Sequence, residues 1–353
     1  MRKSKPEPAT VAPGSEPLNR RQFCGLLASA AGALLLPSST DAQRWHYHGP
    51  GDRGWGPPWR QPVTSSRMLE VGGARIQLDF SAGTLDLPSS AIVDWVQRAA
   101  KAVTVYYGHF PVPRERVVVV FVQGQDGVFG GTTWGGVDGF PAFTQIHVGQ
   151  HTTENQLIAD WTMTHEMVHT AFPSQQDLHH WIEEGLATYV EPVARVQAGF
   201  LTAAEIWGDM VRDMPKGSPQ VGDEGLDRTH TWGRTYWGGA QFCLLADVTI
   251  RKQTRNRKGL QDALRAIVNS GGTIDTTWPL TKALAVGEEA TGTTVLTDQY
   301  NRMKNTPVRV NLKRLWRELG IERGADGTVL FNAAAPYAAI REAITRMPKP
   351  AAR

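Results

Sequence analysis

The chain has 353 residues, 41% of them hydrophobic and 20% charged, and its 37 basic and 34 acidic residues give a net charge of +3. This composition excludes a fibrous or disordered protein, and the length is sufficient for one large domain or two modest ones. A nucleic-acid binder would carry a clustered basic excess. The one basic run, Arg251 to Lys258, is interpreted as a solvated loop, so no nucleic-acid partner is expected.

The first 42 residues have the layout of an export signal. Arg20 and Arg21 precede an apolar run from Gly25 to Leu36, and small residues follow up to Ala42, where we expect cleavage. The apolar run is much shorter than the roughly 20 residues that cross a bilayer, so no stable membrane anchor is expected. The paired arginines resemble a twin-arginine signal, with an ordinary secretory leader as the alternative. Both predict a periplasmic or secreted protein.

Removal of residues 1–42 takes away five basic and three acidic residues and leaves a net charge of +1. Cys24 leaves with this segment, so Cys243 cannot form an intrachain disulfide, and its apolar neighbours predict a buried helix position. Residues 43–62 are predicted to be a linker, because their Gly, Pro, Trp and His residues sustain neither helical nor strand periodicity.

Residues 63–172 are predicted to form an α/β part. The expected elements are a hairpin over residues 67–80 that turns at Gly72 and Gly73, a helix over 89–107, strands over 114–122 and 142–149, and a helix over 153–172. Thr153 and Gln156 form the capping box of that last helix, and Pro173 ends it. The glycine-rich stretch 123–140 is predicted to be a loop, which makes strand 142–149 a sheet edge.

Residues 173–353 are predicted to be mainly helical. The expected helices cover residues 181–192, where Pro192 should end the first, then 201–214, 236–253, 259–268, 310–320 and 336–347. No repeat of fixed period is found.

A candidate metal site lies in the predicted helix over residues 153–172, where residues 162–172 read TMTHEMVHTAF. Residues four apart on a helix point the same way, so the imidazoles of His165 and His169 can hold one Zn²⁺ at about 2.0–2.1 Å. Glu166 lies next to the first histidine and could reach a water on that ion without being a ligand. A structural helix carrying this string by chance is the alternative.

A catalytic zinc takes three protein ligands and keeps one position open. In metzincins the third ligand is a later histidine, which requires glycine at 172 and histidine at 175, whereas this chain has Phe172 and Gln175. That class is excluded. Residues 181–191, WIEEGLATYVE, instead resemble the second helix of gluzincin aminopeptidases, which commonly reads Trp-x-x-Glu-Gly-x-x-x-Tyr.

This resemblance implies that Glu184 is the third zinc ligand. Glu183 is the alternative if the register slips by one residue, and His180 is either a competing ligand or a solvated residue at the helix start. The interval from His169 to Glu184 is shorter than in aminopeptidase N-like enzymes and thermolysin. A shortened connection between the two helices would explain this departure.

The resemblance extends over residues 235–264, which are similar to a stretch in glycyl-aminopeptidase-like members of the clan. It implies that the hydroxyl of Tyr236 donates to the oxyanion of the reaction, with a packed core tyrosine as the alternative. The fold implied is α+β: a thermolysin-like zincin catalytic domain with a small sheet and an active-site helix, followed by a mainly helical part. The large N-terminal β-domain and the PDZ-like C-terminal domain of that branch are expected to be absent.

The implied activity is that of an exported zinc peptidase acting on a peptide or protein substrate, with one Zn²⁺, a metal-bound water and Glu166 as general base. The chain lacks the Gly-x-Met-Glu-Asn segment by which many aminopeptidases hold a free amine, so aminopeptidase specificity does not carry over. A silent zincin-fold binding protein and a zinc hydrolase acting on a non-peptide bond are the alternatives. Oligomeric state and cleavage preference are left open.

Overall fold

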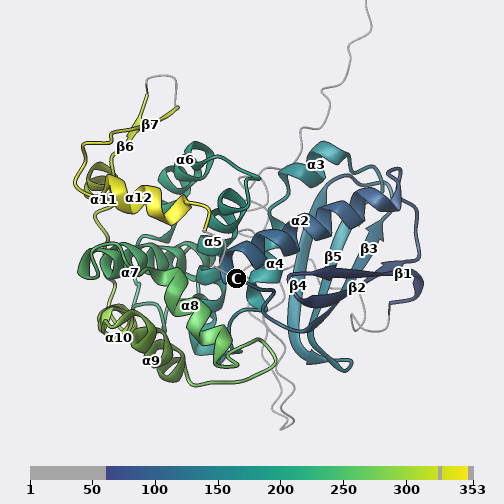
Figure 1. Cartoon of the computed structure of the whole chain (residues 1–353), viewed down its shortest axis with the longest axis horizontal. Coiled ribbons are helices and arrows are strands. Elements are labelled where there is room, and N and C mark those ends of the chain that lie inside the picture. The colour runs from purple at the N-terminus through teal and green to yellow at the C-terminus, as the bar shows by residue number, and fades with distance from the viewer. Residues whose placement is uncertain (1–60, 325–327, 349–353) are drawn as a thin grey trace, which may run out of the picture.

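The structure is a computed structural model that describes residues 61–324 and 328–348 (Figure 1). The predicted export signal over residues 1–42 lies outside the described residues, as does nearly all of the predicted linker over 43–62. Within the part of the chain that is described, every helix is too short or too polar to span a bilayer.

A five-stranded mixed sheet is formed by the first part of the described chain. Its strands are β1 (Val63–Val71), β2 (Ala74–Ser81), β3 (Arg114–Val122), β4 (Val128–Val137) and β5 (Phe140–Gly149), in the order β1-β2-β3-β5-β4. β1 and β2 form the predicted hairpin around Gly72 and Gly73, both of which have positive φ. β2, β3 and β5 are parallel neighbours, and β4 pairs antiparallel with β5 at one edge.

The predicted loop over residues 123–140 is wrong, because residues 128–137 form the edge strand β4. Thr132, Thr133 and Trp134 favour a strand and pair with β5 through a continuous register. The glycines of this stretch suggested a loop, but Gly131 is explained by the side chain of Glu166, which lies close to it. A Cβ on Gly131 would lie 2.6 Å from Cγ of Glu166. The predicted edge at residues 142–149 is therefore an interior strand, and β4 is the free edge.

Helix α2 (Ser89–Tyr107) connects β2 to β3 and packs with α4 (Thr162–His169) on one face of the sheet (Figure 1). Strand alternation directs residues such as Val117, Val119 and Ile146 to this helix-covered face. Val118, Val120, Trp134 and Phe143 form a separate small cluster on the other face. The main core thus lies between the sheet and the helices.

The single helix predicted over residues 153–172 is wrong, because the chain breaks at Asp160 into α3 (Glu154–Ala159) and α4. The capping box of Thr153 and Gln156 at the start of α3 is confirmed. Asp160 is extended, and its carboxylate accepts hydrogen bonds from the backbone N–H groups of Thr162 at 3.1 Å and Met163 at 3.0 Å. The Asp160 carboxylate therefore accepts from the first backbone N–H groups of α4, and α3 and α4 are separate helices.

Helix α5 (His180–Gln197) continues through Pro192, so the predicted end at that residue is wrong. Proline inside a helix costs about 3 kcal/mol because it removes one hydrogen bond and clashes with the preceding turn. Almost every residue of α5 is buried, and the helix packs against α2, α4 and α7 (Gly239–Gln253). This burial outweighs the local penalty.

The remaining part of the chain is mainly helical, as predicted (Figure 1). Its further elements are α6 (Ala203–Asp213), α8 (Leu260–Asn269), α9 (Leu280–Thr291), α10 (Val295–Met303), α11 (Leu312–Leu319), α12 (Ala338–Thr345), the short strands β6 (Ile321–Arg323) and β7 (Val329–Phe331), and the 3-10 turns Asp177–His179 and Met214–Gly217. Cys243 is buried in α7, as predicted. The interpretation of residues 251–258 as a solvated loop is wrong for Arg251, which is buried and forms an ion pair with Asp247 at 2.8 Å.

Gly185 of α5 lies directly against Gly239, the first residue of α7. A Cβ on Gly185 would collide with the Gly239 backbone, which cannot yield like a flexible side chain. We expect Gly185→Ala to lower the free energy of unfolding by about 1–3 kcal/mol, the usual cost of overpacking. Gly208→Ala on α6 is the matched control, because its Cβ meets only a Val329 methyl at 3.2 Å. Urea denaturation that finds both variants equally stable would contradict this expectation.

Candidate metal centre

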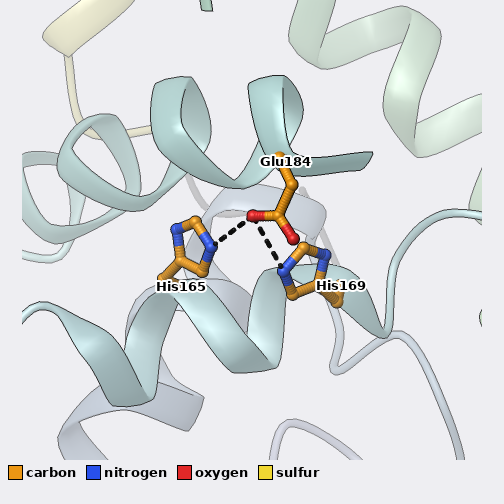
Figure 2. A group of neighbouring side chains, drawn as sticks. All are labelled: His165, His169 and Glu184. Atoms are coloured by element: carbon orange, nitrogen blue, oxygen red, sulfur yellow. Dashed lines mark hydrogen bonds and ion pairs between the residues drawn. The ribbon is translucent and has the colours of Figure 1, made fainter. Parts of the chain in front are cut away.

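The side chains of His165, His169 and Glu184 converge between α4 and α5 (Figure 2). Glu184 Oε2 lies 3.1 Å from Nε2 of His165 and 3.8 Å from Nε2 of His169. The two histidines reach the same carboxylate because they are one helical turn apart on α4. Glu184 points towards them from the neighbouring helix.

The donor atoms of this group fit a zinc ion. Ligand atoms about 2 Å from a tetrahedral ion lie roughly 3.3 Å from one another. The observed separations of 3.1 and 3.8 Å bracket this value. Two imidazoles and a carboxylate are also a ligand set that zinc takes in hydrolases. The group is nearly closed to solvent, with exposed side-chain fractions of 5% for His165, 13% for His169 and 10% for Glu184.

Glu183 and His180, the two alternatives for the third ligand, lie beside this group and not in it. Glu183 Oε1 accepts a hydrogen bond from the backbone N–H of Gln175 at 3.1 Å, and its Oε2 lies 3.4 Å from Nδ1 of His180. Nε2 of His180 lies 3.4 Å from Glu184 Oε1, the oxygen that does not face the other two histidines. His180 therefore contacts Glu184 on the side that faces away from His165 and His169.

The electrostatics of the group favour a bound cation. Burial alone would raise the pKa of Glu184, but His169, His165 and His180 together lower it far below its ordinary range. Burial would likewise lower the pKa of His165, but the hydrogen bond and the charge of Glu184 raise it above its ordinary value. A divalent ion held by the group would compensate the charge of this carboxylate.

Glu166 lies beside the group on α4 and is buried. Its carboxylate Oε2 accepts a hydrogen bond from Oγ1 of Thr133 on β4 at 2.9 Å, and Gly131 of the same strand leaves room for its side chain. Burial raises the pKa of Glu166 to about 7, with His165 opposing and Glu184 adding to the rise. A carboxyl group with such a pKa can both accept and release a proton near neutral pH.

Tyr236 lies in a π-helical turn, Gly233–Gly238, that precedes α7, so the α-helix predicted from residue 236 begins only at Gly239. The Tyr236 ring stacks on the imidazole of His165 with 6.2 Å between ring centroids, and Trp232 stacks on Tyr236 at 5.7 Å. The π-helical turn, a feature frequent at functional sites, thus brings Tyr236 against a candidate metal ligand.

A second polar cluster next to the site was not predicted from the sequence. Asp227 accepts hydrogen bonds from Nε1 of Trp181 at 2.8 Å and from the hydroxyl of Tyr300 at 2.8 Å, and its Oδ2 lies 3.6 Å from Nε2 of His179. Trp181 belongs to the same helix as Glu184. Asp227 therefore anchors the start of α5, and only the tertiary contact reveals this role.

We expect Asp227→Ala to lower the free energy of unfolding by about 1–3 kcal/mol, because it leaves the buried indole N–H of Trp181 unpaired, whereas the hydroxyl of Tyr300 still has Nε2 of His179 at 3.0 Å. Burial would raise the pKa of Asp227, but hydrogen bonds from His179, Trp181 and Tyr300 lower it below its ordinary value. The stabilisation is therefore present above about pH 4, the unfolded value, and is lost as the pH falls through the lower folded value. Urea denaturation of the parent and the variant should show a difference that shrinks only at acidic pH; a constant difference would contradict this assignment.

The fold is similar to that of a solved aminopeptidase N family protein. No family model and no curated protein matches the chain. An aminopeptidase N family protein from Idiomarina loihiensis matches with a TM-score of 0.51 and 13% identity, over 73% of this chain and 49% of that chain. An M1 zinc metallopeptidase from Deinococcus radiodurans gives a TM-score of 0.44 and 13% identity, over 71% and 52% respectively. This chain thus spans about half the length of each of these proteins. The described part of this chain therefore has an α+β fold similar to that of the aminopeptidase N family protein.

Proposed function

We propose that this chain is an exported zinc-dependent peptidase. The observation that carries the proposal is the convergence of His165, His169 and Glu184 on one point, with the buried carboxyl group of Glu166 beside them. The name of the Idiomarina protein that shares the fold supports the same class of reaction. Export rests on the sequence pattern of residues 1–42.

In this proposal His165, His169 and Glu184 would hold one Zn²⁺. A zinc ion held there would supply Lewis acidity, which lowers the pKa of a bound water to about 7 and polarises a carbonyl group. Glu166 accepts a proton from the attacking water and later delivers it to the leaving amine. The hydroxyl of Tyr236 donates to the oxyanion that develops on the carbonyl oxygen, an interaction whose loss typically costs on the order of 10²–10³ in rate.

The substrate in this proposal is a peptide in extended conformation. The edge strand β4 has its outer side free of any strand partner in the described sheet, and Gly131 of β4 lies against Glu166. A peptide that adds to this edge through backbone hydrogen bonds would bring a carbonyl group past the catalytic carboxyl. Strand β5, which the sequence predicted to be an edge, is interior and cannot take this role.

The test is metal analysis of the purified protein, followed by digestion of a peptide library with and without a chelator. We expect one zinc per chain, cleavage of internal or terminal peptide bonds, and loss of cleavage with the chelator that added zinc restores. Zinc without cleavage would overturn the peptidase and favour a binding protein of this fold. Absence of zinc would overturn the whole proposal.

A further inference from the structure

A line of polar side chains crosses the helix-covered face of the sheet and ends at Glu166. Oε1 of Glu115 on β3 lies 2.7 Å from Oγ1 of Thr144 on β5, and this oxygen lies 2.9 Å from Oγ1 of Thr133 on β4. Thr133 in turn lies 2.9 Å from Oε2 of Glu166. Three contacts between oxygen atoms therefore join two buried carboxyl groups through two hydroxyls.

These side chains occupy positions where the strands otherwise present apolar residues to the core. Glu115 shares its face of β3 with Val117 and Val119 by strand alternation, and Thr144 lies between Ala142 and Ile146 on β5. Buried polar groups at such positions are costly unless they are hydrogen-bonded. Packing of the core alone gives no reason for a carboxyl group here.

The hydroxyl and carboxyl hydrogens of this line of four side chains can be assigned from its geometry. Besides Oε2 of Glu166, the Thr133 hydroxyl lies 3.1 Å from the backbone carbonyl oxygen of Glu166, which can only accept. The single hydrogen of Thr133 is therefore directed to Glu166. The contact between the two threonines then needs the hydrogen of Thr144, and the contact between Thr144 and Glu115 needs a hydrogen from the carboxyl group of Glu115.

The surroundings of Glu115 favour the same protonated form. The residue is 0% exposed, and its Oε2 has no hydrogen-bond partner among the described residues. Burial raises the pKa of Glu115 to about 8 and Glu166 adds to this rise, whereas a hydrogen bond donated by Thr144 would oppose it. An unpaired oxygen in the core costs much less free energy in a neutral carboxylic acid than in a charged carboxylate.

We propose that Glu115 carries a proton and is a positioning residue, which orients the carboxyl group of Glu166 through Thr144 and Thr133. The ordered hydroxyls fix Oε2 of Glu166, and Oε1, which lies beside Gly131, is left to exchange protons with water and the leaving amine. What Glu166 does rests on the proposed function. The proton on Glu115 does not, and it can be observed without any activity.

The proton on Glu115 is tested by infrared difference spectroscopy of the full chain carrying isotope-labelled glutamate at neutral pH. A protonated carboxyl group gives a carbonyl band separate from those of amides and carboxylates. Glu166→Gln in both proteins removes the contribution of Glu166, whose pKa of about 7 would also produce this band. In that background we expect the band when Glu115 is present and its loss in Glu115→Gln. A band that persists after Glu115→Gln, or is absent before it, would overturn the proposal even if the protein has no activity.

The positioning role is tested by the kinetics of variants at Thr133 and Glu115. Thr133→Val should lower kcat about tenfold or more with KM and zinc content unchanged, because it removes a hydrogen bond to a charged group. Thr133→Ser restores the hydroxyl and should restore kcat. Glu115→Gln should also stay close to the parent, because a neutral amide can donate to Thr144 as the acid does. Thr291→Val on α9 is the matched control for loss of a buried threonine hydroxyl.

The outcomes separate the two proposals. Full kcat in Thr133→Val, or a kcat in Thr133→Ser as low as in Thr133→Val, would overturn the positioning role while the peptidase stands. A parent protein that binds zinc but cleaves nothing would overturn the peptidase, and the infrared band would still decide where the proton lies.

Discussion

Glu166→Gln is expected to keep zinc bound while it lowers the hydrolysis rate by on the order of 10²–10⁴, the usual contribution of a general acid–base. The amide has nearly the shape of the carboxyl group, so the hydrogen bond from Thr133 and the space beside Gly131 are retained. It cannot accept the proton of the attacking water. The histidines of the metal group and Glu184 are untouched.

This expectation is checked by measuring zinc content and kcat/KM on the same preparation, with any peptide that the parent cleaves. Glu154→Gln on α3 is a matched control, because it makes the same change at an exposed acid outside the site. Parent-like cleavage by Glu166→Gln would remove Glu166 from the mechanism. Loss of zinc in this variant would mean that Glu166 supports the metal centre itself.

Glu184→Ala is expected to reduce zinc affinity by more than about a hundredfold, because it removes a direct ligand, and loss of an outer-shell partner already costs about 10–100-fold. Hydrolysis should disappear with the metal. The variant also leaves His180 without the carboxylate oxygen that lies 3.4 Å from its Nε2. Zinc titration and the shift of the thermal midpoint on zinc addition both measure this loss, since an ion that binds the folded state stabilises it.

Glu183→Ala is the matched control for this prediction, because Glu183 is the adjacent acid and bonds to Gln175 and His180 instead of the metal group. It should bind zinc about as well as the parent. Retention of zinc by Glu184→Ala together with its loss in Glu183→Ala would reverse the assignment of the third ligand.

The candidate metal residues could be named from the sequence because each one depends on local helical geometry. His165 and His169 share a face through their spacing alone, and the choice between Glu183 and Glu184 came from a resemblance in a short helical pattern. The structure brings Glu184, and not Glu183, to the two histidines. Helices with clear periodicity, such as α6 and α11, were likewise predictable.

Features that depend on neighbours distant in sequence could not be predicted in this way. The glycines of β4 resemble a loop until Glu166 is seen to fill the space beside Gly131. The end of α3 follows from a side chain, Asp160, that also fits a helix interior. Pro192 remains helical only because α5 is buried by other helices. One sequence feature pointed to Glu115: it is an acid on the same side of its strand as buried valines. Its hydroxyl partners could not be predicted, because they lie on other strands.

The close approach of Gly131 to Glu166 also constrains the engineering of this protein. Even an alanine methyl at residue 131 would meet Cγ of Glu166 at 2.6 Å, and so would push either the strand or the base out of place. In the proposed function a peptide adds along this edge, so a library designed to change its specificity should hold residue 131 fixed and diversify the rest of β4. Clones that change residue 131 should be enriched among the inactive members.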